Sequence, residues 1–276
     1  MKLFNKVAIV GVGLIGGSIA LDIKKKRIAN EVIGVSRHRK SLLSAKRLGA
    51  IDRGSQNIAI IRDADLVILA TPVGTILKSA PLISKLVKPE CLVSDVGSTK
   101  HQIVSKLDRI FTNYVGSHPL AGSEKRGVLN AHPNIFRGSL CILTPTKKTK
   151  PKNLEKLEKF WKMLGAKTIF LSTENHDRIL SFVSHLPHVA AFSLMESMPK
   201  QYLRFSPSSL KDTTRIAASD SELWGDIFLS NRKNMLKTIA LLQKNLSRIK
   251  HAINKKEKGL LNKILKEAQI KRKILR

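Results

Sequence analysis

The 276-residue chain is 42% hydrophobic, which supports a real core, excludes wholesale disorder and allows one large domain or two of ordinary size. Its 50 lysines and arginines exceed its 20 acidic residues, giving a net charge of +30. These basic residues are spread along the chain without interleaved aromatics, so the charge argues for anionic substrates and against a nucleic-acid partner. The two cysteines, Cys91 and Cys141, lie in apolar runs and are predicted to be buried reduced thiols, not a disulfide or a metal site.

The N-terminal segment imitates a secretion signal, because the basic Met1–Lys6 precedes the apolar run Val7–Leu21. Four glycines interrupt that run, and it closes on an aspartate and three lysines without a convincing cleavage site. Its 15 residues are also fewer than the roughly 20 that span a bilayer as a helix. We therefore expect a cytoplasmic protein with no membrane partner, and we interpret the segment as a strand, a loop and a helix.

The first 172 residues alternate short β-rich runs with helical stretches. The predicted strands are Lys6–Val10, Glu31–Val35, Ala64–Ala70, Cys91–Ser94, Tyr114–Ser117, Leu140–Leu143 and Thr168–Leu171. Predicted helices follow the first two strands, at Ile15–Lys26 and Arg39–Leu48. Strands separated by helices imply crossover connections, and strands that are apolar without alternation imply a sheet covered on both faces. Residues 1–172 are therefore predicted to form a doubly wound α/β domain.

The strand pattern stops after about Ser172, and helical spacing of apolar residues takes over. The predicted helices are Glu174–Met198, Ser208–Ala218, Ser221–Ile253 and Lys256–Ile274. Pro187 lies inside the first of them and is expected to kink or break it. Within the third, one face can be shared by Leu236, Ile239, Ala240, Leu246 and Ile249. Residues 173–276 are predicted to form a separate, all-helical domain.

A glycine-rich loop directly follows the first predicted strand and opens a helix. In this setting Gly11 permits a tight turn, Gly13 allows the backbone to approach a pyrophosphate, and Gly16 lets the helix pack on the strand. The free N–H groups and positive dipole end of the helix then favour the phosphates. The pattern predicts a Rossmann-type dinucleotide site. Leu14 and Ile15, within the loop, are expected to line this site. Thr71 and Pro72, which follow the strand Ala64–Ala70, are expected to line it as well.

The end of the second strand bears on the choice between NAD and NADP. An acidic residue about 20 positions after the glycine motif normally binds the ribose 2′-hydroxyl. Ser36 stands there instead, followed by Arg37 and, two residues on, Arg39. A missing carboxylate removes repulsion of a 2′-phosphate, and an arginine can bind that phosphate through two hydrogen bonds. We therefore predict NADP, with NAD as the alternative, because basic residues are so abundant that the two arginines could be incidental.

Polar segments follow two further strands, where open α/β sheets bind ligands. They are DVGSTK at residues 95–100 and SHPLAGSEKRG at residues 117–127, and a third segment, NHD…SHLPH, spans residues 175–188. With the glycine loop and the later DTTRIAASDSELWGDIFLSN, they resemble the prephenate/arogenate dehydrogenase family in order and spacing. The resemblance runs from about Lys6 to about Asn231. It implies a Rossmann domain followed by a helical domain that forms most of a homodimer interface.

The resemblance also implies a reaction: hydride leaves ring carbon C4 of prephenate for the nicotinamide while CO₂ leaves C1, and the ring becomes aromatic. A neutral histidine suits the hydroxyl proton because its pKa lies near working pH. His118, at a strand end, is the predicted base, although it could merely cap a turn before Pro119. By resemblance, Ser98 would hydrogen-bond the same hydroxyl. Lys100 and Glu124 are expected to order the loops around the site.

The two carboxylates of the substrate need their own partners. Arg215 is predicted to bind the ring carboxylate, since a guanidinium forms paired hydrogen bonds to a carboxylate. His185 and His188 would share a helix face and contact the substrate side chain. The structural alternatives are a dimer salt bridge for Arg215 and satisfied, partly buried histidines for the other two. Trp224 is expected to serve packing or to line the pocket.

Three other functions compete with the prephenate assignment. Arogenate carries an amino acid side chain where prephenate carries a keto acid, and by resemblance His188 favours prephenate. A β-hydroxyacid dehydrogenase would also pair a Rossmann domain with a helical one, but typically places a catalytic lysine on the helical domain. A basic nucleotide-sensing or nucleic-acid-binding protein could share the fold, since function resides in the site. The polar strand-end segments favour the prephenate type over both.

Overall fold

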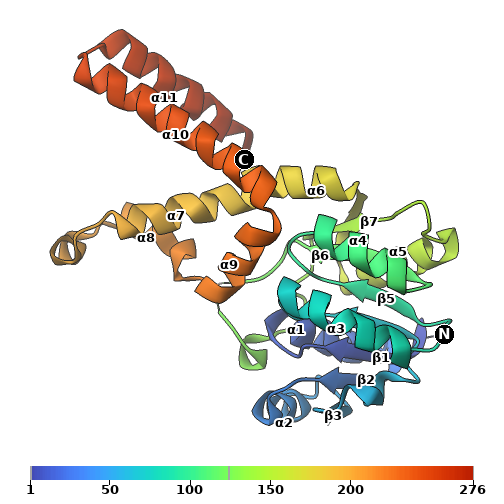
Figure 1. Cartoon of the computed structure of the whole chain (residues 1–276). Helices are drawn as coiled ribbons and strands as arrows, with labels where there is room; N and C mark the ends of the chain where they lie inside the picture. The colour runs from blue at the N-terminus through green and yellow to red at the C-terminus, as the bar shows by residue number, and fades with distance from the viewer. Residues whose placement is uncertain (1, 124, 276) are drawn as a thin grey trace.

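The computed structural model describes residues 2–123 and 125–275, so the predicted role of Glu124 lies outside the described residues. Eight strands form one sheet in the order β3-β2-β1-β4-β5-β6-β7-β8 (Figure 1). The strands are β1 Phe4–Val10, β2 Ala29–Val35, β3 Arg53–Ser55, β4 Leu66–Leu69, β5 Leu92–Asp95, β6 Tyr114–Pro119, β7 Leu140–Thr144 and β8 Lys167–Phe170. The predicted α/β fold is confirmed, and only the short β3 was missed.

The strand directions determine where a ligand can bind. Every neighbouring pair from β3 to β6 is parallel, whereas β6 and β7 are antiparallel and β7 pairs in parallel with β8. The first six strands have the order of dinucleotide-binding sheets, with a switch point between β1 and β4. Ligands bind outside the carboxyl ends of strands at such a point. The carboxyl ends of β1, β4, β5 and β6 all lie along this edge.

Helices cover both faces of the sheet, and successive residues of β1 supply both cores. Val7 and Ile9 pack with helices α1 Leu14–Lys25, α2 Arg39–Arg47 and α5 Pro151–Leu164. On the other face, Ala8 and Val10 pack with α3 Val73–Leu86 and α4 His101–Ile110. Full burial of one large aliphatic side chain stabilises the fold by about 1.5–3 kcal/mol, which explains why these strands are apolar without alternation.

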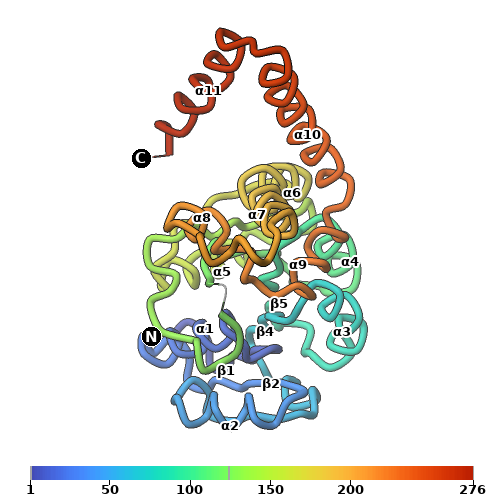
Figure 2. Tube along the Cα trace, turned by 90° about the vertical axis from the view of Figure 1, so that its left-hand side faces the viewer, coloured from blue at the N-terminus to red at the C-terminus, as the bar shows by residue number. Residues whose placement is uncertain are grey.

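The second half of the chain is helical, as predicted. Its helices are α6 Thr173–Leu180, α7 Leu186–Glu196, α8 Ser208–Thr214, α9 Ser221–Ser230, α10 Arg232–Asn254 and α11 Lys258–Arg272. The last two form a hairpin that projects away from the sheet (Figures 1 and 2). No helix within residues 2–123 and 125–275 is long and apolar enough to cross a membrane.

Two helix breaks shape the site. At Pro187, where a kink or break was expected, the regular α-helix is interrupted: a π-helical turn, Ser181–His185, separates α6 from α7, and Pro187 in the first turn of α7 lacks the N–H that would continue the α-helical bonds. The prediction of one continuous helix over Ser221–Ile253 is wrong. The chain breaks at Asn231, whose buried side chain bonds across to α6 and to the π-helical turn.

The α10–α11 hairpin exposes many large apolar side chains. These include Leu236, Leu246, Ile253, Leu260, Leu265 and Ile270. Two of them, Leu236 and Leu246, belong to the predicted apolar face of α10, and only Met235, Thr238 and Ala252 of this helix are buried within the chain. An exposed apolar face of this extent is typical of a surface that another protein chain covers.

Candidate active site

The glycine loop has the geometry that a dinucleotide requires. Gly11 has φ of +105°, and a Cβ there would lie 2.6 Å from the carbonyl oxygen of Ala70. A Cβ on Gly16 would lie 2.1 Å from the oxygen of Gly11, so this glycine allows α1 to pack on the loop. A Cβ on Gly13 would meet nothing within 4 Å. Gly13 therefore leaves its side of the loop open to an approaching pyrophosphate.

A groove of about 320 Å³ runs along the switch point. Six of the predicted site residues line it: Gly13, Leu14, Ile15, Thr71, Pro72 and Ser98. The buried hydroxyl oxygen of Thr71 has no hydrogen-bond partner there, so it offers a polar contact to a bound ligand. Because α1 begins at the groove without a side-chain cap, its first N–H groups are free for phosphates. These residues fit a dinucleotide cofactor.

The loop after β6 closes the groove against the helical half of the chain. Residues 121–123 and 125–127 form one wall, and Leu223 of α9 lies beside them. Arg126 forms an ion pair with Asp220, whose other oxygen caps α9 by accepting from the N–H of Leu223 at 2.8 Å. The groove is therefore bounded by both halves of the chain.

The three residues predicted to meet the adenosine ribose closely follow β2 and do not line the groove. Ser36 accepts a hydrogen bond at Oγ from the N–H of His38 at 3.2 Å, and Arg37 and Arg39 are exposed. Helix α2 begins at Arg39, with no side-chain cap and no acidic residue in its first turn. This surface presents free N–H groups and positive charge, and its chemistry suits an anion.

His118 lies near the carboxyl end of β6 and is 9% exposed. Its Nδ1 is 2.9 Å from Nε2 of His176 on α6, and Nδ1 of His176 is 2.8 Å from Oδ1 of Asp177. Asp177 also accepts from the N–H groups of Lys100 and His101 at 2.7 and 3.0 Å. A hydrogen-bonded chain thus runs from the N-terminus of α4 through Asp177 and the imidazole ring of His176 to His118.

This chain determines where the protons of both rings lie. Burial opposes ionisation of Asp177, but its hydrogen bonds from His176 and two backbone N–H groups outweigh that and lower its pKa. The ionised carboxylate accepts from Nδ1–H of His176, whose Nε2 then accepts from Nδ1–H of His118. Burial, with the charges of His176, Lys100 and His185, lowers the pKa of His118 well below its ordinary value. His118 is therefore a neutral ring with its lone pair on Nε2.

A buried ion pair fixes the strand ends beneath His118. Lys100 and Asp95 are both fully buried and bonded to each other, and Lys100 Nζ also donates to the carbonyl oxygen of Ser117 at 3.0 Å. Asp95 accepts further from Tyr114 Oη at 2.7 Å and from the N–H of Gly97 at 2.8 Å. Together these bonds hold the loop after β5 to the end of β5 and to β6. The expectation that Lys100 orders the loops around the site is confirmed.

The helical half adds three predicted residues and an indole ring. His188 stacks on Trp224 with ring centroids 3.4 Å apart, and His185 meets the same indole edge to face at 6.0 Å. Burial and the positive charge of Arg215 both lower the pKa of His188, which places Arg215 near this cluster. The structure thus gathers His185 and His188 around Trp224, beside the groove to which Leu223 belongs, and the short turn that begins at Arg215 packs on α7.

Sequence reasoning assigned no role to His176, Asp177 or Asn231. The triplet Asn175–Asp177 was conspicuous beside SHLPH, and adjacent histidine and aspartate could have suggested a relay. No spacing rule, however, places His176 against His118, because 58 residues separate them. Asn231 ends a stretch whose apolar spacing continues into the next helix, so the helical pattern concealed it.

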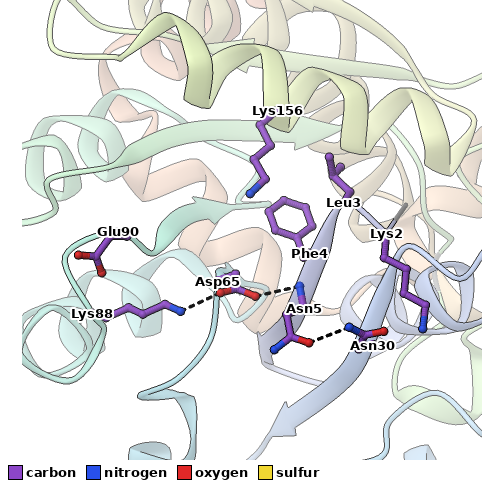
Figure 3. Close-up of a pocket in the computed structure, with 9 residues that line it drawn as sticks. All are labelled: Lys2, Leu3, Phe4, Asn5, Asn30, Asp65, Lys88, Glu90 and Lys156. Carbon is purple, nitrogen blue, oxygen red and sulfur yellow. Dashed lines mark hydrogen bonds and ion pairs between the residues drawn. The ribbon is translucent and has the colours of Figure 1, made fainter.

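A separate cavity of about 480 Å³ lies at the opposite edge of the sheet (Figure 3). Its central acid, Asp65, already accepts from the N–H groups of Asn5 and Lys6 and from Lys88 Nζ, at 2.7–2.9 Å. The side chains of Asn5 and Asn30 bond to each other. With these groups satisfied and no strand carboxyl end nearby, this cavity has the weaker claim to a reaction.

Two family models match consecutive parts of the chain. One, described as "Prephenate dehydrogenase, nucleotide-binding domain", matches residues 19–170, and the other, "Prephenate dehydrogenase, dimerization domain", matches residues 172–267. The prephenate dehydrogenase of Bacillus subtilis is 37% identical over 243 residues, 84% of this chain and 66% of the relative. The chain therefore spans about two thirds of that relative's length.

Two other relatives match over nearly their whole length. The cyclohexadienyl dehydrogenase of Zymomonas mobilis is 32% identical over 98% of this chain and 95% of the relative. The crystal structure of Aquifex aeolicus prephenate dehydrogenase with hydroxyphenyl propionate and NAD⁺ has a TM-score of 0.93 and 36% identity, over 99% and 98% of the two chains. Fold, groove and relatives together define a nicotinamide-dependent oxidoreductase with a helical second half. The chain belongs to the prephenate dehydrogenase family.

Proposed function

We propose that the protein oxidises and decarboxylates prephenate to 4-hydroxyphenylpyruvate, with NADP as the hydride acceptor. The observation that carries this proposal is His118: a buried, neutral imidazole whose lone pair is assigned to Nε2 by the chain of bonds to His176 and Asp177. General-base catalysis by a positioned histidine contributes about 10²–10⁴-fold to a rate. The reaction needs such a base, because the ring hydroxyl must lose its proton as hydride leaves.

In the proposed reaction, the C4–H bond breaks with its electron pair, and the bound oxidised nicotinamide supplies the hydride acceptor. The hydroxyl proton passes to His118 Nε2, leaving a carbonyl at C4. The bond between C1 and its carboxylate breaks, CO₂ leaves, and the electron pair enters the ring, which becomes aromatic with a negative charge on the C4 oxygen. That oxygen takes a proton back from the imidazolium of His118 to give the hydroxyl of 4-hydroxyphenylpyruvate. Ser98 hydrogen-bonds the hydroxyl, and Arg215 binds the ring carboxylate. The resulting imidazolium is stabilised by its Nδ1 bond to His176 and, through it, by Asp177.

The preference for NADP rests on the end of β2. Ser36 stands in place of an acid, and the exposed Arg37 and Arg39 flank the uncapped start of α2. A 2′-phosphate would meet positive charge and free N–H groups there. The Aquifex relative was solved with NAD⁺. The choice between NADP and NAD is therefore the part of the proposal that most needs a direct measurement.

We assign residues 1–172 to cofactor binding and residues 173–276 to substrate binding and dimerisation, in a cytoplasmic homodimer. The division is supported by the two family models, which meet between residues 170 and 172. The homodimer is supported by the exposed apolar side chains of α10 and α11 and by the name of the second family model. Both cysteines are free and buried, as suits a reducing compartment.

Arogenate is the second candidate substrate. The presence of His188 favours prephenate by resemblance, but the position of its hydrogen favours arogenate. Nδ1 of His188 lies 3.0 Å from the carbonyl oxygen of Ser184 and must donate to it, so neutral His188 has its lone pair on Nε2. A lone pair can accept from the ammonium group of an amino acid side chain. The related Zymomonas protein is named for cyclohexadienyl substrates as a class.

The test follows the absorbance of reduced nicotinamide for prephenate and arogenate, each with NADP and with NAD. We expect the fastest turnover with prephenate and NADP. Turnover with arogenate but not with prephenate would show that arogenate is the substrate. A preference for NAD over NADP would show that NAD is the cofactor. Silence of all four pairings in a protein that binds the cofactor would refute the reaction class.

A further inference from the structure

Asn231 occupies the single-residue junction between α9 and α10 and is 4% exposed. Its Nδ2 donates to the carbonyl oxygen of Asp177 at 2.7 Å and lies 3.2 Å from Nδ1 of His185. A carbonyl oxygen can only accept, so the amide must present its NH₂ group to this side. Its Oδ1 accepts from Asn234 Nδ2 at 2.8 Å. The orientation of the Asn231 amide is therefore fixed by its partners.

This orientation determines the proton of His185. One amide hydrogen of Asn231 goes to Asp177, and the second points to Nδ1 of His185, which must accept it with a lone pair. A neutral imidazole carries one hydrogen, so that of His185 lies on Nε2. Burial favours the neutral ring by lowering the pKa of His185 to about 4.

The resulting N–H group has no partner within the described residues. His185 is 1% exposed, and its Nε2 is buried without a hydrogen bond. A buried N–H group without a hydrogen-bond acceptor is unfavourable. The site therefore suits a ligand that brings an acceptor to this group. Protonation of His185 would also oppose protonation of His118, and the ring lies against Trp224. This donor therefore belongs to the cluster beside the groove.

We propose that Asn231 is a positioning residue that holds His185 as an Nε2–H donor for an oxygen of the substrate's carboxylate-bearing side chain. The inference rests on the proposed function and deepens it. His185 and His188 then have opposite polarities, because Asn231 donates to Nδ1 of the first ring whereas Ser184 accepts from Nδ1 of the second. A keto acid side chain consists of acceptor oxygens, and the His185 donor matches it.

The test exchanges Asn231 for aspartate, which is nearly isosteric but accepts where the amide donates. At about pH 9, where a histidine is neutral, N231D would move the His185 hydrogen to Nδ1. Ring-nitrogen NMR on isotope-labelled histidine reports the tautomer, and H185Q identifies the His185 signals. Losing a hydrogen bond to a charged acceptor raises KM about 10–100-fold, with a smaller change in kcat. Asn234→Leu is the matched control, since it removes the Oδ1 bond and leaves the donor to His185 in place.

The wild-type spectrum alone can overturn the assignment, if His185 carries its hydrogen on Nδ1. A folded N231D protein with a moved hydrogen and an unchanged KM would overturn the substrate contact. A fall in melting temperature with unchanged tautomer and KM would reduce Asn231 to a structural role. Absence of turnover by the wild type with every substrate would refute the proposed function, whereas the NMR spectrum tests the proton of His185 independently of turnover.

Discussion

Replacing Asp177 by asparagine is expected to reverse the protons of the chain that ends at His118. An asparagine oxygen in the place of Oδ2 can still accept from the N–H of His101, so one of the two bonds that cap α4 is retained. The NH₂ group then takes the place of Oδ1, which accepts from both Lys100 N–H and His176, and the bond from Lys100 is lost. This NH₂ group would face Nδ1 of His176, which must then accept. The hydrogen of His176 moves to Nε2 and is donated to Nδ1 of His118, whose own hydrogen moves to Nε2. His118 would lose the lone pair that its role requires.

The magnitude follows from two effects. The bonds of 2.9 and 2.8 Å, with roughly 2 Å across the His176 ring, place the carboxylate about 8 Å from His118 Nδ1, where an effective dielectric constant of about 20 gives about 2 kcal/mol. That charge alone stabilises an imidazolium at His118 enough for about 30-fold in rate. Loss of a general base costs about 10²–10⁴-fold. We therefore expect kcat to fall by at least about 10²-fold.

The assay compares kcat for prephenate with cofactor affinity and melting temperature in the same preparations. Glu174→Gln is the matched control, since Glu174 contacts the side chain of His101 at the same end of α4, where both side chains are exposed and the contact contributes little. We expect D177N to bind the cofactor normally and E174Q to remain fully active. A folded D177N protein with kcat within about three-fold of wild type would refute the relay, because the worked effects all exceed that ratio.

Four further predictions concern separate parts of the molecule. His118→Asn should lower kcat by ~10²-fold or more with unchanged cofactor binding, and an active variant would exclude His118 as the base. Ser36→Asp should shift the ratio of catalytic efficiencies from NADP toward NAD, and an unchanged ratio would refute the 2′-phosphate assignment. The unfolded state binds a proton at His185 below pH ~6.5 and the folded state only below about pH 4, so the contribution of His185 to stability should be constant above pH ~6.5 and fall by about 3 kcal/mol between these values; H185Q should make the decline of melting temperature in this range less steep, and an equally steep slope would count against it. Leu246→Glu should shift the protein toward monomers in sedimentation while Lys250→Glu does not, and a dimer in both would place the interface elsewhere.

The sheet could be predicted because its strands are buried on both faces and therefore carry unbroken apolar runs. The two edge strands, β3 and β8, are largely exposed. β8 was still predicted because it contains the apolar pair Ile169 and Phe170, whereas Arg53–Ser55 of β3 have no apolar pattern to detect. The glycine loop could be predicted equally well, since at Gly11 and Gly16 the neighbouring backbone comes so close that any side chain would clash with it. These features depend on local sequence, which is why one sequence sufficed.

The polar contacts of the site could not be predicted in the same way. His118 and Ser98 are found from their places after strands, but the bond from His118 to His176 depends on how α6 docks on the sheet. The continuous helix expected through Asn231 failed for a related reason. The break is stabilised by side-chain bonds to residues 46 and 54 positions away, and no helical periodicity reports such bonds.

The bond between His118 and His176 has a consequence for assembly, because it crosses the seam between the two halves of the chain. Asp177 fastens the same seam through the backbone of Lys100 and His101. A nascent chain released after the sheet, a proteolytic fragment or a misdocked conformer would retain the glycine loop but lack the partner that orients the base. Such species could sequester the dinucleotide without oxidising anything. The proton acceptor is therefore correctly oriented only after both halves of the chain have folded and docked.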